Sequence, residues 1–325
     1  MNRREFLRRS LAAGVGASLA LTGLQRVRAA EGAVTQFGTF IDLTRCDGCK
    51  DRSLPLCVDA CREANWDKFP QPRKEDLKPY WPQKNYEDWS EKQHVTDRLT
   101  PYNWTFVQEV EVEHGGQRVT VYIPRRCMHC DNPPCANLCP FSAQEKKPQG
   151  PVVIDPHVCF GGAKCREVCP WHIPQRQAGV GLYLKVAPKF AGGGVMYKCD
   201  LCYGRITRGG IPDCVEACPR GALAFGPKEE MRQEAHRRAG SLGGYIYGEK
   251  ENGGTSTFYV SAIPFESINK ALLAAKQQPP MPVGVGNFLD TPNGLAQAVL
   301  LAPVAGLVAA GVAAYRGLQG GKKDG

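Results

Sequence analysis

The sequence lacks the short motifs of the common hydrolytic and nucleotide-binding enzymes. It contains no Gly-rich phosphate-binding loop, no His-Glu-x-x-His zinc motif and no Gly-x-Ser-x-Gly nucleophile turn. Aromatic residues make up only 9% of the 325 residues, whereas glycine (36) and proline (25) are frequent. No catalytic apparatus is evident, and this composition is typical of a loop-rich fold that metal centres help to stabilise.

Cysteine is the residue that stands out. All fifteen cysteines fall into four closely spaced groups: Cys46, Cys49, Cys57 and Cys61; Cys127, Cys130, Cys135 and Cys139; Cys159, Cys165 and Cys169; and Cys199, Cys202, Cys214 and Cys218. Each group ends in Cys-x3-Cys, and in three of them proline follows directly (Pro140, Pro170 and Pro219). Bacterial-type ferredoxins bind their clusters with this ligand run. The sequence therefore predicts four iron–sulfur clusters and an electron-carrying function.

The third group lacks one ligand. Gly162 stands where the neighbouring groups have their second cysteine, and glycine has no side chain that could bind iron. Fifteen thiolates divide most simply into three clusters with four ligands and one cluster with three. This division predicts three [4Fe–4S] centres and one [3Fe–4S] centre. The alternative is a four-iron cluster with water or hydroxide on its last iron.

Zinc and disulfide bonds are the other uses of such cysteines. Zinc sites usually combine two Cys pairs separated by a longer loop, without the Cys-x3-Cys-Pro ending. Disulfides are common in exported proteins, but the cysteine count is odd and the groups are too closely spaced for independent bridges. A metal-stabilised scaffold without a redox function is the corresponding functional alternative.

The N-terminus is typical of a twin-arginine export signal. Asn2–Leu7 contains an Arg pair followed by x-Phe-Leu, and a mild apolar run and a small-residue cleavage site ending at Ala29 follow. The run is too short and too weakly apolar to span a membrane; a soluble amphipathic helix is the alternative. Because this route exports folded proteins, clusters can be inserted in the reducing cytoplasm. We expect residues 1–29 to be a signal peptide and the mature chain to lie on the periplasmic side of the inner membrane.

The positive charge of the precursor is concentrated in that segment. Residues 1–29 hold six Arg and one Glu, so their removal lowers the formal charge from +9 to +4. Clusters with their thiolates are anionic and lower the charge further. The basic precursor therefore gives no argument for nucleic-acid binding.

Residues 30–240 are predicted to form the four-cluster domain, of the α+β class. The expected strands cover residues 37–43, the hairpin 106–123, and residues 152–155 and 223–225. Cluster loop, short helix and short strand recur in that order, which indicates an internal repeat. The charge pattern of residues 228–240 favours an exposed helix.

A long insertion, residues 62–126, separates the first two cysteine groups. It holds four tryptophans: Trp66, Trp81, Trp89 and Trp104. Loops of this length inside a compact domain are usually functional. We expect the insertion to cover a cluster or to grip a partner subunit, with a solvated excursion as the alternative. A smaller loop protrudes from the first group, where seven residues separate Cys49 from Cys57.

The C-terminal region is predicted to anchor the chain. Leu295–Tyr315 is almost entirely apolar and uncharged, and as a helix it would be about 31 Å long at ~1.5 Å per residue, enough to cross the hydrocarbon core. The sequence therefore predicts a transmembrane helix over residues 294–316. Because basic residues follow it, residues 317–325 are predicted to form a cytoplasmic tail. A buried helix or an interfacial anchor is the alternative. Residues 241–293 are expected to form an extended tail that docks a partner.

Several stretches resemble the four-cluster ferredoxin-like subunits of periplasmic respiratory oxidoreductases. The resemblance rests on the four cysteine groups, on Gly209–Pro219, on Tyr247–Thr255 and on the C-terminal apolar span. It looks closest to the ferredoxin-like subunit of membrane-bound uptake [NiFe] hydrogenases and extends to the formate dehydrogenase beta subunit and related molybdopterin-enzyme subunits. It implies electron flow between a catalytic subunit and an integral membrane quinone-reactive partner. The stretched first group and Gly162 depart from the hydrogenase pattern.

The resemblance also implies two nested bacterial-ferredoxin-like modules. In two-cluster ferredoxins the fourth cysteine of one run binds the other run's cluster; here the first run would nest with the fourth, and the second with the third. The implied [4Fe–4S] ligand sets are Cys46, Cys49, Cys57 and Cys218; Cys199, Cys202, Cys214 and Cys61; and Cys127, Cys130, Cys135 and Cys169. Cys159, Cys165 and Cys139 would hold the [3Fe–4S] centre.

Four clusters without a catalytic apparatus are best explained by a non-catalytic electron-transfer subunit. The rival is an enzyme that uses the exposed iron at Gly162 as a Lewis acid, but no stretch supplies the acid–base residues and the substrate pocket that such an enzyme needs. Three further side chains are candidates for tuning the clusters. His129, inside the second ligand loop, could donate a hydrogen bond to a cluster sulfur, and Lys198 and Arg205 flank the fourth group.

Overall fold

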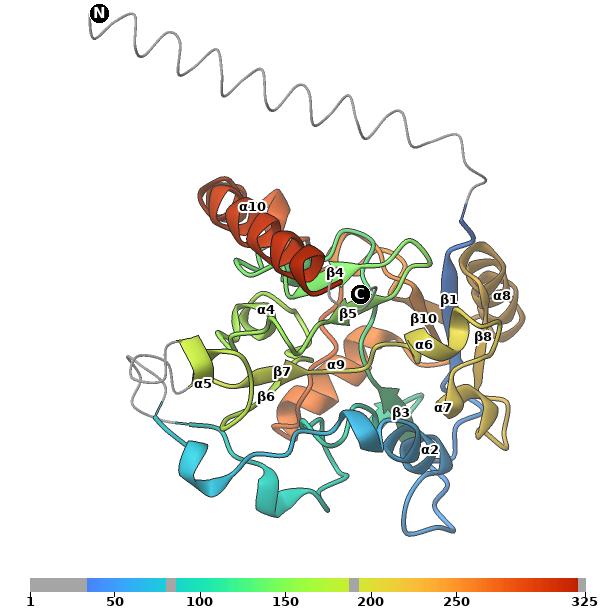
Figure 1. Ribbon diagram of the computed structural model, residues 1–325. Helices are drawn as coiled ribbons and strands as arrows, with labels where there is room; N and C mark the ends of the chain where they lie inside the picture. Colours follow the sequence, from blue (N-terminus) through green and yellow to red (C-terminus); the bar gives the residue numbers. More distant parts are fainter. Residues whose placement is uncertain (1–33, 80–85, 187–192, 321–325) are drawn as a thin grey trace, which may run out of the picture. The chain divides into compact units, whose positions relative to one another are not determined.

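The computed structural model describes residues 34–79, 86–186 and 193–320 (Figure 1). The expected signal peptide, Trp81 and the residues after 320 lie outside the described residues. The chain from Gln36 onward forms one unit, and the description below concerns that unit.

A four-stranded sheet brings together segments from both ends of this unit (Figure 1). Its strand order is β8-β1-β10-β9. The central strand β1 (Phe37–Asp42) lies antiparallel to β8 (Leu223–Pro227) and parallel to β10 (Thr257–Ser261). The edge strand β9 (Tyr245–Tyr247) lies antiparallel to β10. β1 and β8 confirm the strands predicted at residues 37–43 and 223–225.

Side chains of this sheet alternate between two buried faces. On one face, Phe40 packs against Ala235 of helix α8 (Lys228–Leu242), which confirms the predicted helix. On the other face, Ile41 and Tyr259 belong to the main core, which also contains the cysteine groups. The sheet therefore separates α8 from the cysteine-rich interior.

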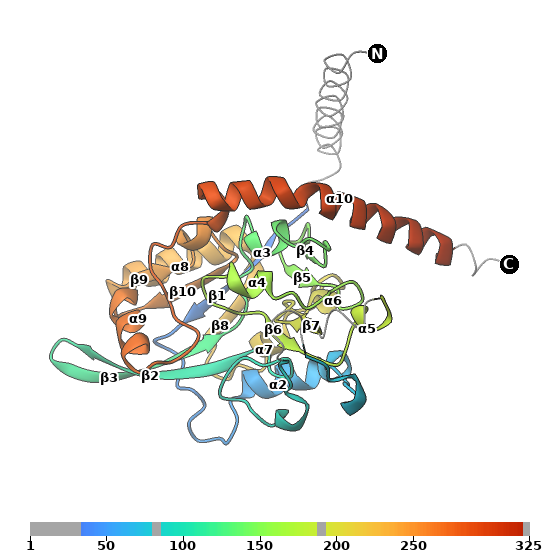
Figure 2. The same cartoon turned by 90° about the vertical axis from the view of Figure 1, so that its left-hand side faces the viewer.

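The predicted hairpin is present as β2 (Phe106–His114) and β3 (Gln117–Arg125). Its turn residues Gly115 and Gly116 have φ of 59° and 76°, left-handed values that glycine adopts readily and that two-residue hairpin turns require. Helix α9 (Phe265–Ala274) packs against β2 (Figure 2). The hairpin is thus held on a segment distant in sequence.

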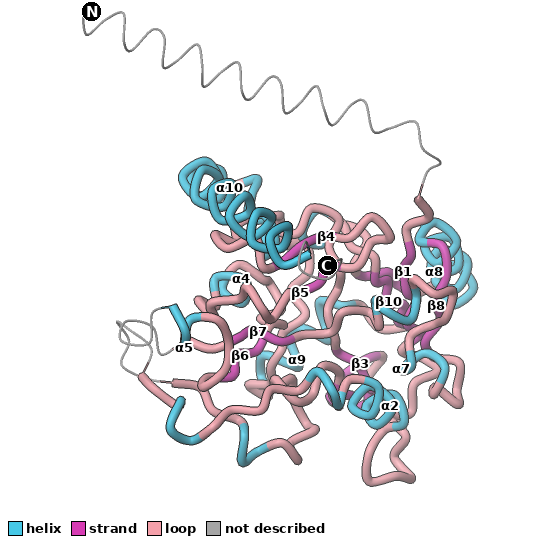
Figure 3. Tube along the Cα trace, in the orientation of Figure 1, coloured by secondary structure: helices cyan, strands magenta, loops and turns pink. Residues whose placement is uncertain are grey.

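Short strands and helices follow the cysteine groups, with loops between them (Figure 3). Two-stranded sheets pair β4 (Gln144–Lys146) with β5 (Val152–Ile154), as predicted for residues 152–155, and β6 (Gln175–Gln177) with β7 (Val195–Tyr197). The helices are α2 (Leu56–Ala64), α3 (Pro134–Asn137), α4 (Lys164–Glu167), α5 (Tyr183–Val186), α6 (Tyr203–Ile206) and α7 (Asp213–Glu216). The 3-10 turns are η1 (Trp66–Lys68), η2 (Lys74–Asp76), η3 (Ser90–Lys92), η4 (Glu251–Gly253) and η5 (Phe288–Asp290).

Regular elements occupy much of residues 241–293, for which the sequence predicts an extended tail; docking of a partner by this region stays a prediction. β10 lies between β1 and β9, all five of its residues are buried, and α9 follows it. The run Thr257–Ser261 is rich in the β-branched and aromatic residues that strands favour. Its partner β1 lies more than 200 residues earlier, so the local sequence does not reveal the pairing.

The prediction of a transmembrane helix over residues 294–316 is not supported. A helix does form, α10 (Pro292–Gly320), with Pro303 inside it. Among the residues that the structure describes, however, no helix is both long and apolar enough to cross a bilayer.

Replacing Tyr247 with phenylalanine should destabilise the core. The Tyr247 hydroxyl accepts a hydrogen bond from Trp171 Nε1 at 2.6 Å and donates one to the Pro282 carbonyl at 2.9 Å. Without the hydroxyl, the indole N–H is left without a partner inside the core, which costs about 1–3 kcal/mol. Thermal unfolding under anaerobic conditions would measure the loss. Tyr245→Phe, at a 43% exposed site, should leave the midpoint unchanged, and equal midpoints for both variants would contradict the expectation.

Candidate metal centres

Packing between short helices brings distant cysteines together. α2, which carries Cys57 and Cys61, packs against α7, which carries Cys214. α3, which carries Cys135, packs against α4, which carries Cys165. The first cysteine group therefore lies beside the fourth, and the second beside the third.

Cys46, Cys49, Cys57 and Cys218 line one small cavity. Val107 of β2 also contributes to its wall. Burial raises the pKa of the Cys46 thiol to about 11, and the neighbouring Cys218 and Cys49 add to the increase. Four thiols thus converge from both ends of the cysteine-rich region.

The second set is Cys61, Cys199, Cys202 and Cys214. Burial, and then the proximity of the other three sulfurs, raises the pKa of Cys61 well above its ordinary value. Burial also raises the pKa of Cys199, to about 12, although the guanidinium of Arg126 acts in the opposite direction. This set is more deeply buried than the first.

The third set is Cys127, Cys130, Cys135 and Cys169. Burial and the neighbouring Cys130, Cys169 and Cys127 raise the pKa of Cys135 well above its ordinary value, against the influence of Lys198. Burial raises the pKa of Cys169 to about 11. Four thiols from two runs again meet at one place.

Only three thiols form the fourth set, Cys139, Cys159 and Cys165. Burial, followed by the proximity of Cys159 and Cys139, raises the pKa of Cys165. Gly162 is exposed, so the position that lacks a thiol faces outward. Gly161 before it has φ of 64°, and a Cβ there would lie 2.6 Å from the Gly194 carbonyl oxygen. Only glycine fits that position, and the loop geometry is therefore tightly fixed.

In each set that the resemblance implied, the structure places several thiols near one another, and all fifteen cysteines are free thiols. Which thiols share a cluster stays a prediction. Among the described residues, no group of three or more His, Cys, Asp or Glu side chains is arranged to hold a single metal ion. The type of cluster that each set holds stays a prediction.

Nitrogen donors around the sulfurs fit iron–sulfur clusters. Backbone N–H groups of Ala143, Met196 and Leu201 donate to Cys139 Sγ, Cys159 Sγ and Cys199 Sγ at 3.3, 3.4 and 3.3 Å. The buried Asn252 amide donates to Cys130 Sγ at 3.2 Å. Such N–H···S bonds stabilise the negative charge of a cluster and contribute to its potential.

Two buried cations also fit anionic clusters. Arg126 is 1% exposed, and its Nη1 lies 3.8 Å from Cys214 Sγ, while Nε and Nη2 have no hydrogen-bond partner in the described part of the chain. Lys198 is 5% exposed and donates to the carbonyl oxygens of Val152 and Cys199. A buried charge is costly unless an opposite charge lies nearby. A cluster with its thiolates supplies that negative charge.

Comparisons with known proteins agree with these centres. Two family models, each described as a 4Fe–4S dicluster domain, match residues 45–143 and 119–228. The hydrogenase-2 operon protein HybA of Shigella flexneri is 31% identical over 312 residues, covering 83% of this chain and 83% of that protein. The chain belongs to the ferredoxin-like iron–sulfur subunits of oxidoreductases.

Other members of this family show the same similarity. A protein of Nitratidesulfovibrio vulgaris is 31% identical over 274 residues, which cover 82% of this chain but only 66% of that protein. The probable anaerobic dimethyl sulfoxide reductase chain YnfG of Escherichia coli is 34% identical over 200 residues, which cover 62% of this chain and 78% of that protein. The two dicluster matches together include all four cysteine groups, so the alternative of zinc is wrong. This chain is an iron–sulfur electron-transfer subunit.

His129 links two ligand sets of this iron–sulfur subunit. Its Nδ1 accepts a hydrogen bond from the Val152 backbone N–H at 3.0 Å, so the ring proton resides on Nε2. Nε2 lies 3.7 Å from Cys199 Sγ. The sequence suggested a hydrogen bond to a sulfur, but the sulfur reached belongs to the fourth run. Burial holds the pKa of His129 well below its ordinary value, and the ring is neutral.

The other two charged candidates differ from each other. Lys198 is buried among the thiols, as described above, whereas Arg205 forms ion pairs with Asp213 and Glu216 of α7, the second at 2.5 Å. Arg205 therefore stabilises the loop of the fourth run. Sequence reasoning missed Arg126, although its position directly before Cys127 was an available signal.

Parts of the insertion 62–126 pack against cysteine-bearing segments; that the insertion covers a cluster or grips a partner stays a prediction. Lys68 pairs with Asp200 of the fourth run at 2.9 Å. The Trp104 ring stacks on Tyr197 with centroids 6.4 Å apart. The alternative of a solvated excursion is therefore wrong for these parts of the insertion, although Trp66 is 61% exposed.

Replacing Glu87 with glutamine should weaken the contact between the insertion and the segment that carries the third cysteine group, and so lower the free energy of unfolding. Glu87 accepts two hydrogen bonds from Arg166 and one from Arg176, all at 2.7 Å. We expect a loss of about 2 kcal/mol in the free energy of unfolding at pH 7, because charged hydrogen bonds are lost. Anaerobic urea unfolding would measure it. Glu91→Gln, at an exposed pair with Lys74, is the matched control.

The effect of Glu87 should depend on pH. Burial raises the pKa of Glu87, but Arg166 and Arg176 outweigh burial and hold that pKa below its ordinary value. The stabilisation is therefore complete above the unfolded pKa of about 4.3 and is lost as the pH falls through the lower, folded value. The difference between wild type and Glu87→Gln should shrink on acidification. A difference that grows instead would contradict this.

Proposed function

We propose that this chain relays electrons through three [4Fe–4S] clusters and one [3Fe–4S] cluster between a catalytic subunit and a membrane quinone-reactive subunit. It performs no catalysis itself. The observation that carries the proposal is the grouping of fifteen thiols into three sets of four and one set of three. Electron transfer from cluster to cluster needs such a series of closely spaced sites, each with its own ligand set and environment.

The proposed ligands follow the nested pairing. Cys46, Cys49, Cys57 and Cys218 hold the first cluster; Cys61, Cys199, Cys202 and Cys214 the second; Cys127, Cys130, Cys135 and Cys169 the third; and Cys139, Cys159 and Cys165 the fourth. The bound clusters would supply one-electron redox chemistry. The chain contributes the thiolates, the N–H donors that stabilise their negative charge, and the buried Arg126 and Lys198 that make added electrons less costly.

The proposed location is the periplasmic side of the inner membrane. The twin-arginine pattern of Asn2–Leu7 supports it, because folded proteins with inserted clusters leave the cell by that route. A protein that carries its clusters out already bound to thiolates avoids oxidation of fifteen cysteines in an oxidising compartment.

A hydrogenase is the first candidate for the catalytic partner. The similarity to HybA, named for the hydrogenase-2 operon, extends over 83% of both chains and supports it. A molybdopterin enzyme, such as a formate dehydrogenase, is the second candidate. The 34% identity to YnfG, whose name refers to dimethyl sulfoxide reductase, favours an enzyme of that general class.

Iron analysis and EPR spectroscopy of the anaerobically purified protein would test the proposal. We expect about fifteen iron ions per chain, and an oxidised sample with a stoichiometric three-iron signal that resists added ferrous iron. A colourless protein that contains zinc would overturn it. Metal analysis of the large polypeptide that co-purifies would then distinguish nickel, for a hydrogenase, from molybdenum.

A further inference from the structure

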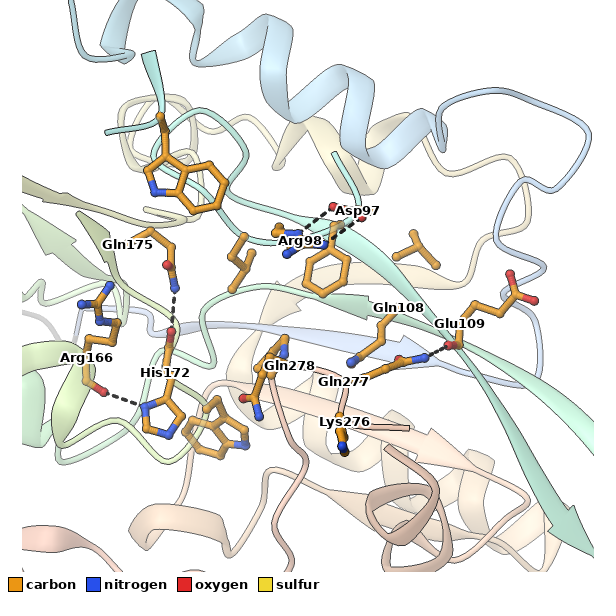
Figure 4. Close-up of a pocket in the computed structure, with 16 residues that line it drawn as sticks. Asp97, Arg98, Gln108, Glu109, Arg166, His172, Gln175, Lys276, Gln277 and Gln278 are labelled. Carbon is orange, nitrogen blue, oxygen red and sulfur yellow. Dashed lines mark hydrogen bonds and ion pairs between the residues drawn. The ribbon is translucent and has the colours of Figure 1, made fainter. Parts of the chain in front are cut away.

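A cavity of about 720 Å³ is lined by no cysteine (Figure 4). Its volume is within the range of ligand-binding pockets. Aromatic side chains from three segments contribute to its walls: Trp89, Phe106 and Trp171. The opposite wall is Lys276–Pro279, after α9. The insertion therefore builds much of this cavity.

Gln108 is an unpartnered polar group in this cavity. It is 3% exposed, and neither Nε2 nor Oε1 has a hydrogen-bond partner in the described part of the chain. Figure 4 shows its side chain extending from β2 toward Gln277 and Gln278. A buried amide without partners costs about 1–3 kcal/mol. Both amide atoms have almost no exposed surface, so an occupant that offers one donor and one acceptor would remove this cost once the side chain turns toward the cavity.

In the described part of the chain, β2 pairs with β3 alone, so its other edge faces the cavity without a neighbouring strand. Val107 lies opposite Pro124, which has no N–H, so this pair is not hydrogen-bonded. The Pro124 carbonyl accepts from the Tyr259 hydroxyl instead. By the alternation of antiparallel strands, Val107 and Glu109 direct their N–H and C=O groups away from β3. The Gln277 side-chain amide already donates to the Glu109 carbonyl at 3.0 Å, in the manner of a neighbouring strand.

We propose that this cavity binds an extended polypeptide segment of the redox partner. An extended peptide presents one N–H and one C=O at each residue, which matches both the open edge of β2 and the amide of Gln108. An apolar or aromatic side chain of the segment would enter between Trp89 and Trp171. A quinone has only acceptor oxygens, and neither a quinone nor its quinol offers the alternating N–H and C=O groups that the edge of β2 can pair with. This inference rests on the proposed function, because it assumes an electron-transfer partner.

The position of the cavity explains why a redox partner would dock there. Val107 lines both this cavity and the one formed by Cys46, Cys49, Cys57 and Cys218. Trp171, also in its wall, lies two residues after Cys169. A bound segment would therefore lie one side chain away from two of the cysteine sets, and would hold the partner where electrons can enter or leave.

Site-specific photo-cross-linking would test the inference. In the full chain, produced with its native partners, a benzophenone amino acid would replace the exposed Gln278 at the cavity rim, and the exposed Gln233 of α8 would be the control. We expect cross-links from position 278 to one contiguous stretch of a single partner polypeptide, and none of these from position 233. Cross-links to a non-peptide adduct alone, or no cross-link in a complex that transfers electrons, would overturn the inference.

The variant Gln108→Leu gives an independent test, because it should weaken partner binding without lowering the unfolding temperature of the free protein. Because both amide atoms lack partners, the free variant should unfold at the same temperature as wild type or a higher one, while affinity for the co-purified partner should fall about tenfold. Gln144→Leu, at a glutamine only 5% exposed in β4, should leave partner affinity unchanged. A lower unfolding temperature with unchanged affinity would make Gln108 a structural residue.

Cluster measurements separate this inference from the proposed function. If the wild-type chain contains no iron–sulfur clusters by EPR, the proposed function fails. If the clusters are present and are reduced in the complex, but neither the cross-links nor the affinity change appear, only the docking inference fails.

Discussion

Replacing Gly162 with cysteine should convert the three-thiol set into a four-thiol set. The iron content should rise by about one ion per chain, and the EPR signal of the oxidised three-iron centre should disappear. Gly162 occupies the position of Cys130 and Cys202 in the neighbouring runs, is exposed, and is not among the residues with positive φ. A cysteine can therefore be accommodated there without backbone strain.

The added thiolate should also lower the reduction potential of that cluster, because it adds negative charge beside the iron. Ala163→Cys is the matched control: it places a thiol one residue after the position of the missing ligand, and should add no iron. If Gly162→Cys left both the iron content and the spectrum unchanged, the fourth set would already hold a four-iron cluster with a solvent ligand.

Replacing Arg126 with methionine should have the second large effect. The guanidinium is buried beside Cys214 and Cys199, and these thiols raise its pKa despite the opposing effect of burial. Removing the cation leaves an anionic cluster without its neighbouring positive charge, and breaking a buried charge pair typically costs about 3–5 kcal/mol. We expect a less stable loaded protein and a more negative potential for the cluster at Cys61, Cys199, Cys202 and Cys214.

EPR-monitored redox titration would measure the potential, and anaerobic thermal unfolding the stability. Arg126→Lys keeps the charge and should retain most of the wild-type potential. Arg118→Met removes an arginine whose side chain is 68% exposed, and should change neither property, because water screens a surface charge. A potential that is equal in Arg126→Met and wild type would show that the guanidinium does not act on the cluster.

Much of the site could be predicted because its chemistry is local in the chain. The spacing of Cys127, Cys130, Cys135 and Cys139 specifies a ligand run directly, and the gap at Gly162 is visible without a fold. The hairpin around Gly115 and a helix over residues 228–240 are predicted for the same reason, and the structure has both. Turn chemistry and charge patterns act over a few residues.

The parts that were missed depend on distant contacts. β10 was read as part of an extended tail, yet it pairs in parallel with β1, which lies more than 200 residues earlier. Two parallel strands must be joined by a long crossover connection, so the residues next to β10 in the sequence do not indicate its pairing with β1. His129 lies in one ligand run but reaches a sulfur of another, which no spacing rule predicts.

The sequence by itself determined which atoms can bind iron in this protein, how many there are, and where one is absent, because a thiol is either present or not. Only the tertiary structure decided which cysteine runs lie side by side, that Arg126 and Lys198 are buried among them, and that the amide of Gln108 has no partner among the described residues. Burial and charge pairing depend on atoms that the fold brings from far apart in the chain, and the energy of a charge in the interior depends on those neighbours.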